Sequence, residues 1–183
     1  MCAATLIGRV SLWRERYHHR RTDGSKEALE VKIFAGKILL ATDGSEEAEL
    51  AARTAIDLAE STGSELHVVY VERVPNFLDG PGTIGYDSLL YDKHEEEGRE
   101  VLRKLVWRVQ VAGGAVGGAH LRMGGVADEV VSLAEELGVG VIVMGSRGHG
   151  GIRRVLMGSV SDSVVRHAHC PVMIVRAQGL LGK

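Results

Sequence analysis

Short aliphatic runs alternate with amphipathic segments of helical period along the chain from residue 37 onward. This alternation is typical of β-α-β units, in which consecutive strands run parallel and a helix joins them across one face of the sheet. Parallel strands cannot be joined by a tight hairpin, so this order of elements constrains the fold strongly. We therefore predict an α/β fold with a doubly wound, five-stranded parallel sheet and helices on both faces.

Five strands and four helices can be placed on this pattern. The strands are expected at residues 37–42, 65–71, 116–122, 140–144 and 172–175, and the helices at residues 45–61, 88–111, 126–137 and 159–167. Ser45 is a candidate N-cap for the first helix, and Gly63 follows the end of that helix. The third strand is the hardest to delimit, because residues 113–118 are rich in glycine.

A chain of 183 residues with 45% apolar content suits one globular domain. We assign that domain to residues 36–177, with an N-terminal arm at residues 1–35 and a tail at residues 178–183. The arm has no convincing period and is predicted to be disordered. Two alternatives stay open for it: a short amphipathic helix at residues 6–17 that touches a membrane or a partner, and a native start downstream of Met1.

Charge and composition exclude several classes of protein. The formal charge is −2, and the chain without its basic first 35 residues carries −5, which argues against nucleic-acid binding. Arg9 interrupts the apolar residues near the start, so no signal peptide is indicated. No stretch has the roughly 18 uncharged apolar residues of a spanning helix, so no stable membrane insertion is expected. Two cysteines without C-x-x-C spacing favour a reducing compartment, and we expect a cytoplasmic protein.

Residues 144–161, with the sequence MGSRGHGGIRRVLMGSVS, lead from an apolar strand through a glycine-rich loop into a helix. Glycine allows a backbone to adopt positive φ and to come close to a ligand. The free N–H groups and the dipole at a helix start attract phosphate. The hydroxyls of Ser159 and Ser161 add hydrogen-bond donors. The segment therefore predicts an anion site.

Two common phosphate motifs do not fit this segment. A Walker A loop needs lysine where Gly151 stands, and G-x-G-x-x-G needs glycine where Arg153 stands. The segment instead has the pattern G-x2-G-x9-G-[ST], which begins at Gly145 and ends at Ser159. With this motif the chain resembles the ATP-binding universal stress proteins, and the resemblance extends over residues 37–176.

This resemblance implies an ATP site, with Mg²⁺ or Mn²⁺ on the phosphates left open. It implies by position that Thr42, Asp43 and Val71 line the adenosine pocket. The residues implied to hold ribose and phosphates are Gly145, Gly148, Gly158, Ser159 and Val160, and we add Met144 and Ser161, which lie on either side of them. Many members of the family have proline or an acidic residue near positions 125 and 126, so this chain departs from the family on the adenine side.

The expected topology brings these residues together on independent grounds. In doubly wound sheets, ligands bind at the carboxyl ends of the strands, where the strand order reverses. In a Rossmann-like order 3-2-1-4-5, strands one and four meet at that point, and they end near Asp43 and Gly145. Simpler interpretations stay open, because Asp43 can act only in the turn before the first helix and Ser159 only as an N-cap.

The other polar residues fall into two groups: some have two possible roles, and the others are expected to have a structural role. Four basic residues of the segment can pair with phosphate oxygens or remain a solvated surface: Arg147, His149, Arg153 and Arg154. His67 is expected to be packed within its strand, and Cys170 to be a small buried residue, because no base pattern accompanies it. No catalytic residue and no metal ligand is assigned.

The resemblance implies an ATP-binding universal stress protein that acts in stress response or signalling. Slow or absent ATP hydrolysis is expected, because the sequence has no Walker-type lysine and no acidic metal cluster. Two alternatives stay open: an enzyme that adenylates a substrate or hydrolyses ATP with Asp43 and the loop arginines, and a partner-binding module with an empty nucleotide site. A homodimer through residues 172–175 is expected, because this strand would form an apolar sheet edge and similar family members often pair there.

Overall fold

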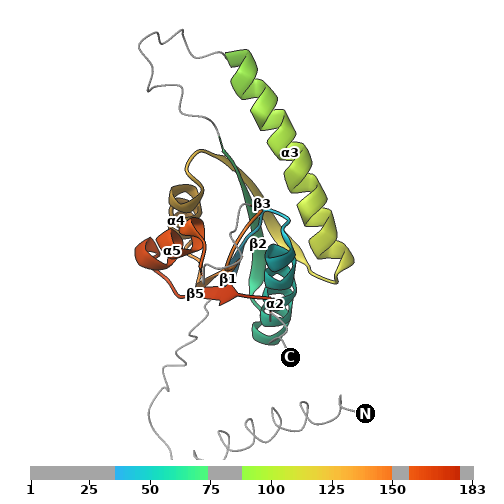
Figure 1. Cartoon of the computed structure of the whole chain (residues 1–183). Coiled ribbons are helices and arrows are strands. Elements are labelled where there is room, and N and C mark those ends of the chain that lie inside the picture. The colour runs from blue at the N-terminus through green and yellow to red at the C-terminus, as the bar shows by residue number, and fades with distance from the viewer. Residues whose placement is uncertain (1–35, 74–87, 150–156, 178–183) are drawn as a thin grey trace, which may run out of the picture. The chain divides into compact units, whose positions relative to one another are not determined.

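Five parallel strands form one sheet within the described residues, in the order β3-β2-β1-β4-β5 (Figure 1). In this computed structural model the strands are β1 Lys37–Ala41, β2 Glu65–Glu72, β3 Val116–Met123, β4 Val141–Gly145 and β5 Val172–Val175. Strand β1 pairs in parallel with β2 on one side and with β4 on the other. The prediction of a doubly wound, five-stranded parallel sheet in the order 3-2-1-4-5 is confirmed.

The structure describes residues 36–73, 88–149 and 157–177. The predictions for the arm at residues 1–35, for Arg153 and Arg154, and for the tail at residues 178–183 lie outside these ranges. Inside them, the bounds of each predicted strand and helix differ from the observed bounds by at most one residue.

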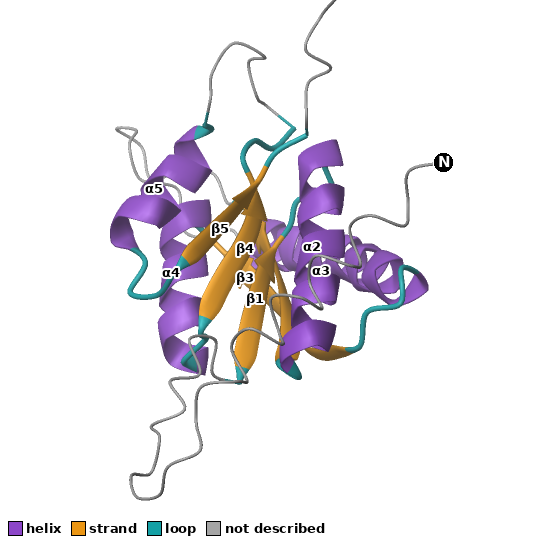
Figure 2. Cartoon of the chain, turned by 90° about the horizontal axis from the view of Figure 1, so that it is seen from below, coloured by secondary structure: helices purple, strands orange, loops and turns teal. Residues whose placement is uncertain are grey.

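Two helices cover each face of the sheet (Figure 2). Helices α2 Glu46–Thr62 and α3 Ser88–Val111 lie on one face, and helices α4 Val126–Leu137 and α5 Ser159–His167 lie on the other. Strand β1 shows how the core divides: Ile38 and Leu40 belong to the core under α2 and α3, whereas Leu39 belongs to the core under α4 and α5. Burial of β1 on both faces explains its continuous apolar run.

Helix α2 begins and ends as its sequence predicts. The Ser45 side chain accepts a hydrogen bond from the N–H of Ala48 at 3.3 Å, which is the N-cap interaction. The helix ends at Gly63, whose φ of 66° lies in the left-handed region that glycine favours. Because alanines are buried on its inner face, the start of α2 can lie close to β4.

Strand β3 contains an irregularity at its glycines, which is why it was hard to delimit. Leu66 pairs with Val116, but the next residue, His67, pairs with Gly118. Gly117 is therefore an extra residue in β3, as in a β-bulge. Beyond it, the alternation of side chains between the two faces changes phase, so a strict period of two does not hold across this strand.

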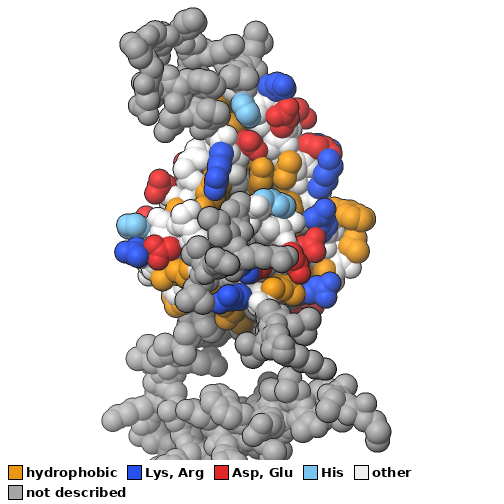
Figure 3. Space-filling view, in the orientation of Figure 1, with side chains coloured by type: hydrophobic (Ala, Val, Ile, Leu, Met, Phe, Trp, Pro, Cys, Tyr) orange, Lys and Arg blue, Asp and Glu red, His pale blue; other side chains and the backbone are white. Residues whose placement is uncertain are grey.

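Charged side chains of both signs are interspersed on the face of the molecule in Figure 3. On this face, the described residues form no extended basic surface of the kind that binds a phosphate backbone. Among the described helices, none combines the length and the apolar character needed to cross a bilayer.

The bulge in β3 makes room for a pair of stacked histidines. The rings of His67 and His120 are 5.3 Å apart, and His67 Nδ1 lies 3.0 Å from His120 Nε2. A side chain at position 118 would overlap the His67 ring, so glycine is required there. His67 is 6% exposed, which confirms that it is packed within its strand.

Stability is expected to decrease with acidification because of this pair. Burial, and then the charges of His67 and Arg122, lower the pKa of His120, although Glu136 on α4 opposes them and Lys37 on β1 adds to them. The fold thus favours neutral His120. The contribution of neutral His120 to stability is complete above the ordinary histidine pKa of about 6.5. It is lost as the pH falls through the lowered pKa of His120 in the folded protein. Urea unfolding should therefore give a smaller free energy at about pH 5.5 than at about pH 7.5.

The variant His120→Asn tests the assignment of this effect. It removes the titrating ring, so its unfolding free energy should depend less on pH in this window than that of the wild type. Equal pH dependence in the two proteins would assign the effect to other groups.

Candidate functional site

A cavity of about 610 Å³ opens at the carboxyl edge of the sheet, where β1 and β4 lie side by side. It brings together all ten site residues predicted from the sequence, which are Thr42, Asp43, Val71, Met144, Gly145, Gly148, Gly158, Ser159, Val160 and Ser161. Segments about a hundred residues apart in sequence thus form one cavity, as expected for the point where the strand order reverses. Contact of these residues with a nucleotide stays a prediction.

Asp43 connects the two sides of the cavity. Its Oδ1 accepts a hydrogen bond from the N–H of Ser45 at 3.0 Å, and its Oδ2 accepts one from the N–H of His149 at 3.1 Å. His149 Nε2 also lies 3.0 Å from the carbonyl oxygen of Asp43. Asp43 thus takes part in the turn before α2, which was the simpler of its two interpretations, and its carboxylate also holds the start of the loop after β4.

The start of α5 faces the cavity without a side-chain cap. Gly158 is its N-cap and makes no side-chain hydrogen bond, so the first N–H groups of α5 have no capping side chain. N–H groups and a helix dipole of this kind are suited to binding an anion. Ser159 is exposed there, as a ligand contact requires.

The Ser161 hydroxyl, predicted from the sequence as a donor to a ligand, is engaged within the protein in this structure. Ser161 is 2% exposed, and its Oγ donates to the carbonyl oxygen of Ser146 at 2.8 Å. A hydroxyl has one proton, so this donor is already used within the protein. Ser161 contributes to the cavity wall by holding the loop.

The expectation that the glycines of the motif adopt positive φ was wrong. Gly158 has a φ of −76°, and Gly145 and Gly148 are not among the described glycines with positive φ. Close packing explains them instead. A Cβ at Gly145 would lie 3.0 Å from the carbonyl carbon of Glu47, and a Cβ at Gly148 would overlap the carboxylate of Asp43.

Three residues beside the cavity form a buried polar cluster that the sequence did not reveal. Glu47, in the first turn of α2, accepts hydrogen bonds from Ser146 Oγ at 2.5 Å and from Arg147 Nε at 3.0 Å. The guanidinium of Arg147 is therefore not simply solvated, because it pairs with Glu47. Burial raises the pKa of Glu47, but the bonds from Arg147 and Ser146 and the charge of Arg147 outweigh it and lower the pKa overall.

The end of β2 adds a second polar group that sequence reasoning missed. Tyr70 Oη donates to Glu72 Oε2 at 2.8 Å, and Glu72 Oε1 lies 3.7 Å from His94 Nδ1. Burial and the neighbouring Glu72 raise the pKa of Tyr70 to about 12. Tyr70 therefore stays protonated and acts here as a hydrogen-bond donor. Tyr70 and Glu72 lie two residues apart in β2 and so share a face, whereas the contact of Glu72 with His94 of α3 depends on the tertiary structure.

The remaining candidates show no catalytic arrangement. Cys170 packs against the core under α4 and α5, and burial raises the pKa of its thiol, which disfavours a nucleophilic thiolate. Among the residues that the structure describes, no group of three or more His, Cys, Asp or Glu side chains is arranged to hold a metal ion.

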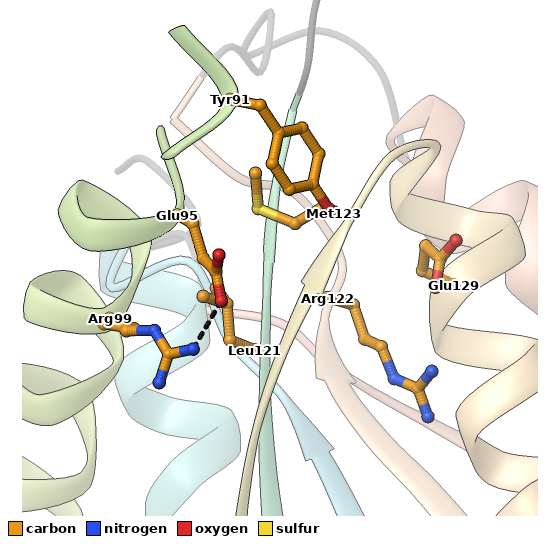
Figure 4. A pocket seen from close by; sticks show the side chains of 7 residues that line it. All are labelled: Tyr91, Glu95, Arg99, Leu121, Arg122, Met123 and Glu129. Atoms are coloured by element: carbon orange, nitrogen blue, oxygen red, sulfur yellow. Dashed lines mark hydrogen bonds and ion pairs between the residues drawn. The ribbon is translucent and has the colours of Figure 1, made fainter. Parts of the chain in front are cut away.

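A second cavity, of about 470 Å³, lies at the end of β3 between α3 and α4 (Figure 4). Two of its charged lining residues are arginines that form ion pairs: Arg99 pairs with Glu95, and Arg122 pairs with Glu136. It contains none of the predicted site residues. The larger cavity is therefore the candidate functional site.

A family sequence model and individual proteins of similar sequence both indicate the same family. The sequence model of the universal stress protein family matches residues 35–176. The universal stress protein MJ0531 of Methanocaldococcus jannaschii is 37% identical over 142 residues, which cover 76% of this chain and 81% of that protein.

Solved structures of similar fold include proteins with bound nucleotides. The universal stress protein from Archaeoglobus fulgidus in complex with dAMP is 25% identical with a TM-score of 0.52, and the match covers 78% of this chain and 98% of that chain. A universal stress protein in complex with cAMP is 24% identical with a TM-score of 0.58, and the match covers 78% of this chain and 97% of that chain. Because the identity to the cAMP complex is only 24%, that likeness bears on the fold alone.

Proposed function

This chain belongs to the universal stress protein family, and on that premise we propose that it binds ATP in the cavity at the carboxyl edge of the sheet. Mg²⁺ or Mn²⁺ would be carried on the phosphates. The protein would act in the cytoplasm as a nucleotide-dependent component of stress response or signalling. The observation that carries the proposal is the meeting of all ten predicted residues in one cavity.

The chemistry of the cavity supports a nucleotide as its ligand. The uncapped start of α5 suits phosphate, and the apolar side chains of Val71, Val126 and Val130 suit the flat face of a base. The relative from A. fulgidus, whose structure contains dAMP, makes an adenine nucleotide a reasonable class of ligand.

Slow or absent hydrolysis fits the charges at the cavity. Phosphoryl transfer needs positioned cations and a base or positioned water at the phosphates. The guanidinium of Arg147 is bound to Glu47, and the carboxylate of Asp43 accepts two backbone N–H bonds. The alternative function is an enzyme that hydrolyses ATP or adenylates a substrate, and conversion of ATP to ADP or AMP over many turnovers would favour it.

Calorimetric titration with ATP and GTP tests the proposal. ATP is expected to bind at least about tenfold more tightly than GTP. Equal affinities would contradict adenine recognition but leave phosphate binding in place. Binding of neither nucleotide by folded protein would overturn the proposed function.

We also propose a homodimer through β5. This strand lies at the end of the described sheet, pairs only with β4 there, and carries four apolar residues. An apolar edge can recruit a second copy of the same strand. Light scattering at micromolar concentration should give twice the mass of one chain, and Ile174→Lys should shift it toward the monomer.

A matched variant and a check of folding complete this test. Val165 is 45% exposed on α5, so Val165→Lys introduces the same charge away from β5 and should leave the dimer intact. Circular dichroism must remain native-like, because Ile174 also packs against the core. Monomeric wild-type protein would contradict the proposal.

A further inference from the structure

Glu47 is an unusual residue for its position, because a carboxylate at the start of a helix is normally solvated. It is only 6% exposed. Its carboxylate accepts bonds from the hydroxyl of Ser146 and from two nitrogens of the Arg147 guanidinium. A buried carboxylate is stable only with such donors around it, so this arrangement holds its partners firmly.

The partners of Glu47 are the two residues between Gly145 and Gly148, which the G-x2-G pattern leaves unspecified. Both are held from α2, because Ser45 Oγ also lies 3.5 Å from the carbonyl oxygen of Arg147. The start of the loop after β4 is therefore tied to the start of α2 through side chains as well as through the sheet.

The connection continues to the start of α5. The carbonyl oxygen of Ser146 accepts a bond from the N–H of Gly158 at 2.8 Å and another from Ser161 Oγ at 2.8 Å. Ser146 thus joins the carboxylate of Glu47 on one side to the first turn of α5 on the other. A continuous set of hydrogen bonds therefore runs from Glu47 of α2, through Ser146, to Gly158 and Ser161 at the start of α5.

We propose that Glu47 is a positioning residue of the nucleotide site, which fixes the loop and the start of α5 through Ser146 and Arg147 before a ligand binds. The inference rests on the proposed function for the identity of the ligand. A site that is already in its bound geometry loses less conformational freedom on binding, so it binds more tightly. In this arrangement Arg147 holds the start of the loop, and the backbone N–H groups of α5 recognise the phosphate.

A second Glu–Arg pair on the same helix provides a matched control. Glu49 lies two residues after Glu47 and pairs with Arg108 of α3 at 3.2 Å. Its side chain is 56% exposed and that of Arg108 is 53% exposed. Such an exposed pair contributes little, so Glu49→Gln changes the same chemical group without touching the loop.

The test compares ATP affinity by calorimetry across pH for the wild type, Arg147→Met, the double variant Glu47→Gln/Arg147→Met, and Glu49→Gln. Arg147→Met leaves Glu47 charged and buried without its cation. Its ATP affinity should fall on the order of tenfold near neutral pH, because a loop that the ligand itself must order costs affinity on binding. Relative to the wild type, this loss should shrink as the pH decreases and Glu47 becomes protonated.

The other variants complete the comparison. The double variant lacks both the carboxylate and the guanidinium that hold the loop, so it should bind ATP more weakly than the wild type, and it should lose the added pH dependence, since no buried charge remains. Glu49→Gln should behave as the wild type. The inference would be overturned if Arg147→Met binds ATP with wild-type affinity. It would also be overturned if Glu49→Gln weakens ATP binding as much as Arg147→Met does.

Hydrogen exchange separates this inference from the proposed function. Amide exchange at residues 157–161 reports the start of α5 without any ligand. It should accelerate in Arg147→Met and remain unchanged in Glu49→Gln. If the wild type binds no ATP, the proposed function fails, and the positioning role of Glu47 still stands or falls on this exchange result.

Discussion

Gly148→Ala is expected to weaken ATP binding on the order of 100-fold while the domain remains folded. The added Cβ would overlap Oδ2 of Asp43, and this oxygen accepts the N–H of His149. The carboxylate must therefore move, and the bond between the two sides of the cavity is lost. Gly148 is exposed, so its surroundings can relax, and the free energy of unfolding should change by no more than about 1 kcal/mol.

Calorimetry with ATP and urea unfolding of the same preparation measure both effects. Gly117→Ala is the matched control, because its Cβ would also overlap a carboxylate side chain, that of exposed Glu65, far from the cavity. This control should bind ATP normally. If Gly148→Ala binds ATP as tightly as the wild type, Asp43 and the loop do not form the nucleotide site.

Gly145→Val should instead destabilise the whole domain, by about 3 kcal/mol. Gly145 is buried at the end of β4, and its Cβ would lie 3.0 Å from the carbonyl carbon of Glu47 and 3.1 Å from the nitrogen of Ala48. These are backbone atoms of α2, which cannot move aside as a side chain can. The helix must shift away from the sheet, and the buried contacts of its alanine face weaken.

Urea unfolding measures this loss, and Gly145→Ala should show a smaller loss because it adds fewer atoms. Binding of ATP should decrease in parallel with the folded fraction. A Gly145→Val protein with wild-type stability and weak ATP binding would show that this glycine serves the ligand alone and that α2 does not limit it.

The elements of the fold were predictable because local signals agreed with the tertiary structure. Ser45 and Gly63 mark both ends of α2, and the apolar run of β1 reflects its burial on both faces. Strand β3 was the exception. Its bulge at Gly117 lies beside the stacked pair of His67 and His120, and a contact between two strands leaves no periodic signal in either of them.

The part of the candidate site that depends on backbone conformation could be predicted from the sequence. The part that is formed by pairs of side chains could not. The spacing of Gly145, Gly148 and Ser159 reflects a loop that enters a helix, which a sequence pattern records directly. Glu47 and Arg147 lie a hundred residues apart, and each has an ordinary explanation alone: an acid at a helix start and a base in a loop. Only the fold reveals that they meet.

The cavity walls come from the turn after β1, the end of β2, the first turns of α4, the start of the loop after β4 and the start of α5. No single segment can therefore retain affinity for a ligand once the sheet separates, and binding is thermodynamically linked to the integrity of the entire domain. A ligand at a hundred times its dissociation constant would stabilise the native state by about 2.7 kcal/mol. The stability of the folded domain would then depend on the concentration of its ligand.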